Sequence, residues 1–513
     1  MPLPLLPILT AIAAIAASLL AAAAAHAART RYALRALPLA RAPHSWLLGH
    51  VPAVSGEDYH DVLVEWAREM TGGAGDFAIA TPLGGRGLVA AAPSTVDAAL
   101  GSRCRGSGAP PPLPKYEHAF RQVEALWPGG AASLFTARAH DARAWKLVRG
   151  ALAPALTSAA ARAAVSDAAA AAAEMAADVA ASVAASPSAS APFDARAAGL
   201  RLALASVSAS LLGVPVSAAL SKPPPAPIAT LPRALAHIQC CMNNPVALLS
   251  MSHRARTGRA AAALYRAAVA AAVSSLDPPP GSAGAALLAL KLPPAQLAAE
   301  VGTLIMAGFE PIANALAFAL CEAAASPEVG GALVAELAAA GLMPPPDGSP
   351  PRPPTASDLP KLPYTAAVVK EALRLHPVVP ATPRAAPRGG AALAGASLPA
   401  GTFVLLLFKA AAVDAGAWGV DAADFRPERW LARADADTTT PRPPSWPYSA
   451  GPRSCPGTLL AQSVTATALA GVWARLELRA AARPLREAAT LTAHPADGHC
   501  TLTARVRGAG GKA

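Results

Sequence analysis

The sequence predicts a mostly α-helical protein with a small β region. A nearly all-apolar segment occupies residues 295–325, and a second segment, 158–183, is mainly alanine, the strongest helix former. Short segments typical of strands occur instead within residues 51–100 and again in 390–408. The chain has 53 prolines, many of them in short runs between these segments, where they favour surface loops.

Composition and charge limit the classes of function. With 53% hydrophobic and 15% charged residues, the 513-residue chain can form a large core and favours membrane contact. A net charge of +11 suits an acidic partner, anionic lipid or nucleic acid. Dispersed basic residues, 4% aromatics and no zinc-ligand spacing argue against nucleic acid. The six cysteines lack CxxC pairs, which argues against a disulfide scaffold.

The N-terminal region predicts a membrane anchor. Residues 3–25 are apolar and uncharged, and as a helix they are long enough to cross a hydrocarbon core of roughly 30 Å. Four arginines follow within 29–41, and the first acidic residue is Glu57, so the rest of the chain is expected in the cytosol. We expect an anchor at 1–28 and a basic, proline-containing hinge at 29–52. A plastid transit peptide and a cleaved signal peptide are the alternatives.

From about residue 51 to 100, short segments typical of strands mix with helix. Residues 76–82 and 87–92 have strand-like composition and flank the turn LGGRG. Helical patterns dominate from residue 117 onward, and the alanine-rich segment is among them.

The longest helix is expected at 295–325, after two prolines that suit a first turn. Because it is apolar on most sides, it should be the buried spine of a large fold. A second membrane span is the alternative, but Glu300, Glu310 and Asn314 make lipid exposure costly. Further helices are expected at 357–380 and 458–476.

The segment YSAGPRSCPG, residues 448–457, places Cys455 just before the helix at 458–476. Helix N–H groups and the charge of Arg453 favour a thiolate there. Glycines allow close backbone approach and prolines stiffen the loop. A thiolate held in this way suits an axial haem ligand, whereas a lone cysteine is more often buried in a tight turn.

This segment resembles the haem-binding loop of the cytochrome P450 family, Phe-x-x-Gly-x-Arg-x-Cys-x-Gly, with Tyr448 in place of the phenylalanine. The matching residues are Gly451, Arg453, Cys455 and Gly457. The resemblance covers about residues 40–505. It implies the mostly α haem-thiolate fold of that family, with haem b as the cofactor and Cys455 as the ligand of its iron.

Other motifs resemble the family in the same order. Glu371 and Arg374 match its E-x-x-R helix, and Arg429 lies in FRPERW, similar to its P-E-R-[FW] segment. The resemblance implies a buried charge network. A solvated pair three residues apart is the alternative, and it would contribute only tenths of a kcal/mol.

Four residues match family groups that hold haem propionates. They are Trp145 and Arg149 in a W-x-x-x-R helix, Arg384, and Arg453. Arginine suits a carboxylate, and an indole N–H can donate once. By itself W-x-x-x-R is a weak signal, since any amphipathic helix can contain it. His376 aligns with a structural histidine and is not expected to be a ligand.

The sequence departs from the family within the long helix. The family has A-G-x-[DE]-T, whose acid and hydroxyl relay protons to dioxygen at the haem. Here Ala307, Gly308 and the acid Glu310 are present, but Pro311 replaces the threonine. Proline also removes the helix bond to the carbonyl of Ala307, so we expect the helix to open there, with room for a water.

The resemblance implies a monooxygenase that inserts one oxygen atom of O2 into a small lipophilic substrate. Electrons would come from NADPH through a membrane-bound reductase at the endoplasmic reticulum, or through a ferredoxin in a plastid. An enzyme that rearranges hydroperoxides or endoperoxides without a reductase, and an inactive haem protein, remain alternatives. The catalytic domain is expected at 53–505, followed by a tail at 506–513. Residues 108–135 and 200–250, expected to line the pocket, carry no signature of the substrate.

Overall fold

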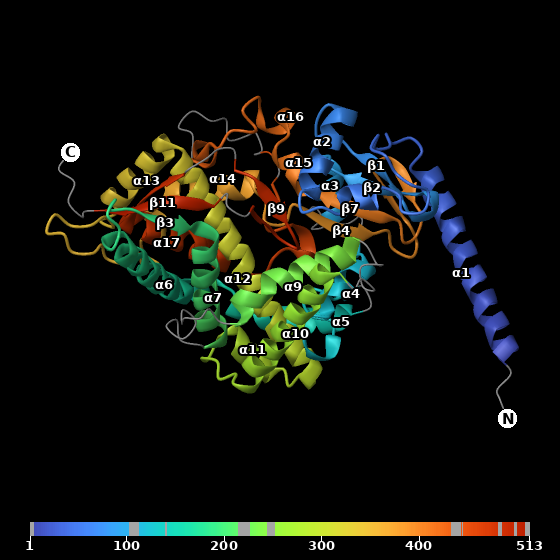
Figure 1. The fold of residues 1–513 in the computed structure, drawn as a ribbon, viewed down its shortest axis with the longest axis horizontal. Coiled ribbons are helices and arrows are strands. Elements are labelled where there is room, and N and C mark those ends of the chain that lie inside the picture. The colour runs from blue at the N-terminus through green and yellow to red at the C-terminus, as the bar shows by residue number, and fades with distance from the viewer. Residues whose placement is uncertain are drawn as a thin grey trace. The chain divides into compact units, whose positions relative to one another are not determined.

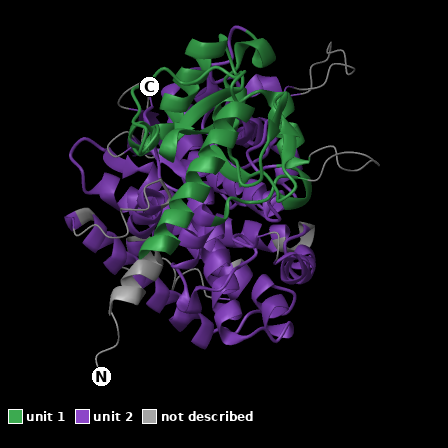
Figure 2. Cartoon of the chain, turned by 90° about the vertical axis from the view of Figure 1, so that its right-hand side faces the viewer, with its two compact units in different colours: residues 1–117, 381–419, 450–453 green, residues 118–380, 420–449, 454–513 purple. Residues whose placement is uncertain are grey.

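The computed structural model describes residues 5–101, 112–138, 141–213, 226–243, 252–431, 443, 445–480, 485–496 and 500–507. The chain divides into two compact units (Figure 2). Unit 1 comprises residues 1–117, 381–419 and 450–453, and unit 2 comprises 118–380, 420–449 and 454–513. Helices predominate over short strands among the described residues, which confirms the predicted mostly α fold with a small β region.

Unit 1 is built on a four-stranded sheet with strand order β1-β2-β7-β4. β2 and β7 pair in parallel, and the other neighbours are antiparallel. The two strands predicted within 76–92 are confirmed as β1 and β2. The strands of this unit are β1 (Phe77–Thr81), β2 (Gly85–Ala90), β4 (Ala381–Ala385), β7 (Phe403–Leu407) and the hairpin β5 (Ala391–Leu393) and β6 (Ala396–Leu398). Its helices are α1 (Leu5–Ala33), α2 (Tyr59–Thr71), α3 (Pro93–Leu100), α15 (Phe408–Ala412) and α16 (Ala415–Trp418).

Helix α1 extends from the sheet of unit 1 as a lone helix (Figure 1). Its last turns pack on the sheet: Ala27 and Thr30 are buried there, together with Leu34 just beyond the helix end. The Thr30 hydroxyl accepts a hydrogen bond of 3.1 Å from the backbone N–H of Arg86. Residues 13–25 are exposed.

The segment expected to be a hinge is held against the sheet of unit 1. The N–H of Ala40 donates to the carbonyl of Ala78, and that of His50 donates to the carbonyl of Ala80, both at 2.9 Å. His50 is fully buried, and its Nδ1 accepts from the N–H of Ala80. The part of 29–52 that follows α1 therefore belongs to the folded unit, because its backbone extends the edge of the sheet.

Unit 2 is mainly helical, with two small sheets of strand order β3-β11-β8 and β9-β10. Its helices are α4 (Glu117–Glu124, which begins at the last residue of unit 1), α5 (Ala142–Ala155), α6 (Ser158–Ala184), α7 (Ala195–Leu212), α9 (Ala226–Asn243), α10 (His253–Ser274), α11 (Ala283–Ala289), α12 (Pro294–Ala325), α13 (Pro327–Ala339), α14 (Pro363–Leu375) and α17 (Thr458–Arg475). Its strands are β3 (Ala191–Asp194), β8 (Leu476–Ala480), β9 (Glu487–Ala489), β10 (Ala493–Pro495) and β11 (Thr501–Val506). The helix predicted at 357–380 is shorter, because prolines at 363 and 377 fix its first turn and its end.

Helix α12 passes through the middle of unit 2 (Figure 1) and is the predicted spine. Two helices of the described chain are long and apolar enough to cross a membrane, Ala13–Ala33 and Pro294–Ala325. Of the apolar window in the second, 83% is buried within the protein, against 11% in the first. Burial therefore identifies α12 as a core helix and leaves α1 as the candidate span.

Two glycines allow α7 and α12 to pack closely. A Cβ atom on Gly308 would lie 2.8 Å from a methyl group of Val207, and one on Gly199 would lie 2.8 Å from the carbonyl oxygen of Ala313. Both distances are too short for a real contact, so each helix needs a glycine where it crosses the other.

Candidate haem-thiolate site

The loop before α17 holds Cys455 through its own backbone. The N–H of Cys455 donates to the carbonyl of Tyr448 at 2.9 Å, which closes the segment into a turn. Gly451 has a φ of +69°, and a Cβ there would lie 2.2 Å from the carbonyl oxygen of Leu100. Gly457 precedes the first residue of α17. The two glycines predicted to matter thus serve a left-handed turn and a helix start.

Cys455 is an exposed residue, and the N–H of Gly457 and the charge of Arg149 lie near its thiol. Of the five cysteines that the structure describes, Cys455 alone is exposed; Cys104 lies outside the described residues. The surrounding loop still keeps much of the water from the sulfur, and this desolvation raises the pKa of the Cys455 thiol; the Gly457 N–H and the charge of Arg149 oppose the shift without cancelling it. A bound cation at the sulfur would reinforce those opposing effects. This donor set fits an iron–thiolate bond.

Arg149 and Trp145 lie on α5 in unit 2. The Arg149 guanidinium donates to the carbonyl of Ser454 at 2.8 Å, directly next to Cys455 in sequence. Its centre lies 5.7 Å from the Trp145 ring. The sequence predicted Arg453 as the cation beside the Cys455 thiolate; the structure adds Arg149 as a positive charge near the same sulfur.

Arg384 and Arg453 lie together in unit 1, with Lys115 as a third cation. Arg384 on β4 is buried, and its guanidinium donates to the hydroxyl of Thr382 at 2.8 Å. Burial and the charge of Arg453 lower the pKa of Arg384 to about 10. Burial and the charges of Arg384 and Arg453 lower the pKa of Lys115. Mutually repelling cations of this kind fit an anionic ligand, such as a carboxylate of a haem.

One face of α12 is accessible in the middle of an otherwise buried helix. Between residues 298 and 321, only Ala307, Gly308 and Pro311 are not buried. Positions i, i+1 and i+4 share a face, so these residues look in a common direction. The predicted opening of the helix is wrong, because α12 continues through Pro311. Neighbouring turns and close packing on α7 maintain the helix despite the missing N–H.

Glu310 leaves α12 about 100° away from Pro311, in a buried polar cluster. The Thr492 side chain and the positive charge of Arg196 lie near its carboxyl group and act on its pKa. Thr492 also accepts a hydrogen bond of 3.2 Å from the amide of Asn314. Burial raises the pKa of Glu310 to about 7, against the opposing effects of Arg196 and Thr492. The carboxyl group can therefore carry a proton near neutral pH.

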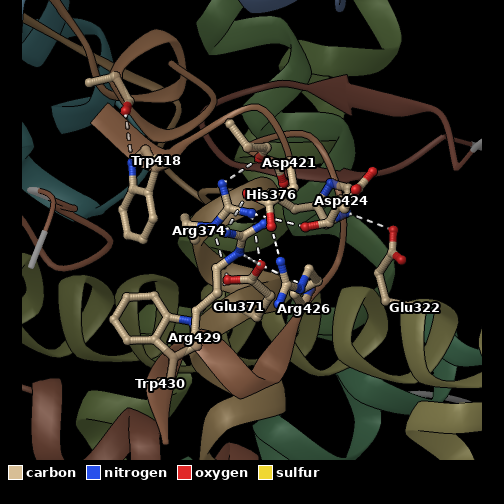
Figure 3. A network of polar contacts seen from close by, with 12 residues as sticks. Glu322, Glu371, Arg374, His376, Trp418, Asp421, Asp424, Arg426, Arg429 and Trp430 are labelled. Atoms are coloured by element: carbon tan, nitrogen blue, oxygen red, sulfur yellow. Dashed lines mark hydrogen bonds and ion pairs between the residues drawn. The ribbon is translucent and has the colours of Figure 1, made fainter. Parts of the chain in front are cut away.

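Glu371, Arg374 and Arg429 meet in one buried network (Figure 3). The Arg374 guanidinium donates to both carboxylate oxygens of Glu371, at 2.8 and 2.7 Å, and both side chains are fully buried. Arg429 donates to Glu371 at 3.2 Å and to Asp421 at 2.9 Å. Trp430 adds an indole N–H bond of 2.8 Å to Glu371. The network joins α14 to residues 421–430, and a solvated pair is excluded by burial.

Sequence reasoning missed three of these groups. Lys115 and Thr492 stand in no motif, and each meets its partners through tertiary contacts alone. Trp430 stands in the segment that supplied Arg429, and its conspicuous indole could have suggested a donor. Residues 108–111, 214–225 and 244–250, which form part of the two segments expected to line the pocket, lie outside the described residues.

Comparison with known proteins agrees with this geometry. The family model of cytochrome P450 matches residues 132–484. The human mitochondrial 25-hydroxyvitamin D-1 alpha hydroxylase is 37% identical over 190 residues, which cover 37% of this chain and 35% of the relative. The cytochrome P450 monooxygenase sphH of Aspergillus fumigatus is 35% identical over 205 residues, which cover 39% of this chain and 37% of the relative. The chain thus spans about a third of the length of these curated relatives.

The fold is also similar to a solved structure. The crystal structure of a cytochrome P450 aligns with a TM-score of 0.71 and 23% identity, covering 87% of this chain and 98% of that chain. The structural likeness supports the fold, and the family model covers well over half of the sequence. The chain belongs to the cytochrome P450 family.

Proposed function

We propose that this protein is a haem-thiolate monooxygenase that inserts one oxygen atom of O2 into a lipophilic substrate with electrons from NADPH. The observation that supports this most is the thiol of the exposed Cys455, held by its backbone turn and flanked by Arg149 and the Gly457 N–H. When bound, haem b supplies the oxygen-activating chemistry, and Cys455 is the ligand of its iron.

The basic residues would hold the carboxylates of the haem. Arg149 with Trp145 in unit 2, and Arg384 with Arg453 in unit 1, are the residues proposed for this role. Lys115 joins them because its position beside two arginines favours an anionic ligand. Tyr448, Gly451 and Gly457 shape the loop that presents the sulfur.

Glu310 would hold the proton that the reaction consumes. Its pKa of about 7 keeps much of the carboxyl group protonated near neutral pH. Ala307, Gly308 and Pro311 would form the wall of the site where oxygen and substrate meet, because they are the accessible positions of α12.

For the substrate, the redox partner and the location of the protein, we propose a class and not a single identity. One relative is named for the hydroxylation of 25-hydroxyvitamin D, which favours an apolar substrate here. A membrane-bound NADPH–cytochrome P450 reductase would donate electrons, with α1 within residues 1–28 as the anchor in the endoplasmic reticulum and residues 53–505 as the cytosolic catalytic domain. A plastid location would replace the reductase with a ferredoxin.

The thiolate assignment is tested by substitution. Cys455→Ala should abolish the red-shifted absorption band of the reduced carbon monoxide complex, because no other described cysteine is exposed. Cys240→Ala is the matched control, since Cys240 is a partly accessible cysteine on α9 and should leave the band intact. A band that persists in Cys455→Ala would show that another residue holds the haem.

A second candidate function is the rearrangement of hydroperoxides, which needs neither a reductase nor proton delivery to dioxygen. The replacement of the family's threonine by Pro311 favours it. Two assays distinguish the functions. The first measures turnover of a lipid hydroperoxide by the protein without a reductant. The second measures oxidation of a panel of lipids by the protein when NADPH and reductase supply electrons. The monooxygenase should act only in the second assay, and Pro311→Thr should raise its product per NADPH. Fast turnover in the first assay alone would identify the rearranging enzyme.

A further inference from the structure

A groove runs between the end of α1 and the β5–β6 hairpin of unit 1. Its larger part, about 690 Å³, is lined by Arg29, Tyr32 and Arg35 from one side and by residues 395–397 and 399 from the other. A second part of about 350 Å³ is lined by Arg29 and Arg388 together with the hydroxyl-bearing Ser397. Because both parts share Arg29, Ser397 and Pro399, they form one continuous basic groove.

The positive charge of this groove is not neutralised by its surroundings. No acidic residue lines either part, and the sequence has none before Glu57 and none within 385–413. Arg29 and Arg388 are exposed, and neither side chain forms an ion pair with another described residue. Arg35 lies 3.8 Å from the ring centroid of Tyr32, which holds its guanidinium at the rim.

The groove lies where a membrane surface would be if α1 spans a bilayer. Ile15, Leu19 and Leu20 of α1 are more than half exposed, and the arginines follow directly at its C-terminal end. Tyr32 is 68% exposed and Trp46 is 63% exposed, as expected of aromatic residues that lie at the level of lipid headgroups. The N–H of Gly84 donates to the carbonyl of Trp46. A Cβ atom placed on Gly84 would lie 3.8 Å from the Arg31 guanidinium, so the Trp46 loop lies beside the same end of α1.

We propose that this basic groove binds the headgroup of an anionic phospholipid, with the lipid phosphate between Arg29 and Arg388. The inference rests on the proposed anchoring by α1. Guanidinium groups match phosphate oxygens in pairs, and Ser397 adds a hydroxyl donor on the same wall. A bound lipid would fix the sheet of unit 1 at the bilayer surface, because the groove joins the anchor helix to the hairpin.

The test uses the full-length haem-loaded protein in nanodiscs that contain equal amounts of phosphatidylserine and phosphatidylcholine. Native mass spectrometry after release from the discs measures the ratio of the two lipids that remain bound. Arg29→Gln and Arg388→Gln should each lower the excess of phosphatidylserine about fivefold, the effect expected of one basic residue at a membrane surface. Arg68→Gln, an exposed arginine of α2 in the same unit, is the matched control and should leave the ratio unchanged.

The outcomes distinguish a lipid site from a site for free phosphate and from anchoring by α1 alone. A wild-type protein without an excess of phosphatidylserine, or variants that retain it fully, would overturn the proposal. Glycerol 3-phosphate that displaces the lipid at equal concentration would also overturn it, because the groove would then be a site for free phosphate. Incorporation into pure phosphatidylcholine discs measures the anchor alone: failure there overturns the anchoring and the lipid site together, whereas normal incorporation leaves the headgroup result decisive.

Discussion

Glu310 matches the acidic position of the family motif, whereas its neighbour Pro311 replaces the family's threonine. Pro311 offers no hydroxyl group on α12, yet Thr492 in the turn between β9 and β10 brings one near the Glu310 carboxyl group. Asn314 donates to the same hydroxyl oxygen. One oxygen of Glu310 and the amide oxygen of Asn314 are buried without a hydrogen-bond partner among the described residues, which is a setting for ordered water.

The pH dependence of coupling should report this contact. The nearby Thr492 side chain acts to lower the pKa of Glu310, which burial raises to about 7. Thr492→Val should therefore raise that pKa further and move the alkaline loss of product per NADPH upward by about one pH unit. Thr490→Val is the control, because Thr490 is equally buried in the same turn. Equal shifts in both variants would assign the effect to the turn and not to the hydroxyl group.

At the scale of elements, His376 joins three parts of unit 2. Its Nδ1 lies 2.7 Å from Glu487 of β9, and its Nε2 lies 3.0 Å from Glu322 of α12. The ring stacks on Phe318 with centroids 4.6 Å apart. Burial by itself would lower the pKa of His376, but the bonds to Glu322 and Glu487 outweigh it and raise the pKa to about 9.

This ion triad predicts an alkaline loss of stability. Because the pKa of His376 in the folded protein, about 9, lies above its ordinary value of 6.5, the stabilisation is complete below pH 6.5. It is lost as the pH rises through about 9, and amounts to about 3 kcal/mol at most. Chemical denaturation at pH 6, 7.5 and 9.5 measures it. His376→Gln should remove most of the pH dependence; parallel curves for the two proteins would contradict the assignment.

The Glu371 network should be worth more than an exposed ion pair. Glu371→Ala leaves the buried Arg374 without its carboxylate partner and removes the acceptor of the Trp430 indole N–H. It should therefore lower the free energy of unfolding by about 3–5 kcal/mol and reduce haem content. Trp430→Phe removes a single bond to a charged group and should cost about 1.5–3 kcal/mol. Glu477→Ala breaks an exposed pair with Arg479 and should change stability by less than about 1 kcal/mol. Equal effects of Glu371→Ala and Glu477→Ala would refute the buried network.

At the scale of the whole molecule, local patterns predicted more than long-range contacts. Propensity and hydrophobicity were sufficient for α6, α12, α17 and the β1–β2 pair, because those signals lie within each segment. The turn that carries Cys455 before α17 was predictable for the same reason. Lys115 and Thr492 were not, since each acquires its role from partners far away in sequence. The segment expected to be a hinge was rich in proline and arginine, and nothing local indicated that His50 would be buried.

The division of α1 into an exposed part and a packed part predicts where the chain can be shortened. Deletion of residues 1–24 removes the exposed apolar turns and keeps Ala27, Thr30 and Leu34 on the sheet. The shortened protein should move from the membrane to the supernatant with haem and melting temperature unchanged. Deletion through residue 34 also removes a fully buried leucine and the Thr30 bond, and should cost about 2–4 kcal/mol. Sedimentation and thermal unfolding measure the two effects separately. If the deletion of residues 1–24 already destabilises the fold, α1 is a structural helix and the anchor lies elsewhere. If the shortened protein stays bound to the membrane, Trp46→Ser in that background should release it. The reason is that the Trp46 loop is the next exposed apolar group beside the end of α1.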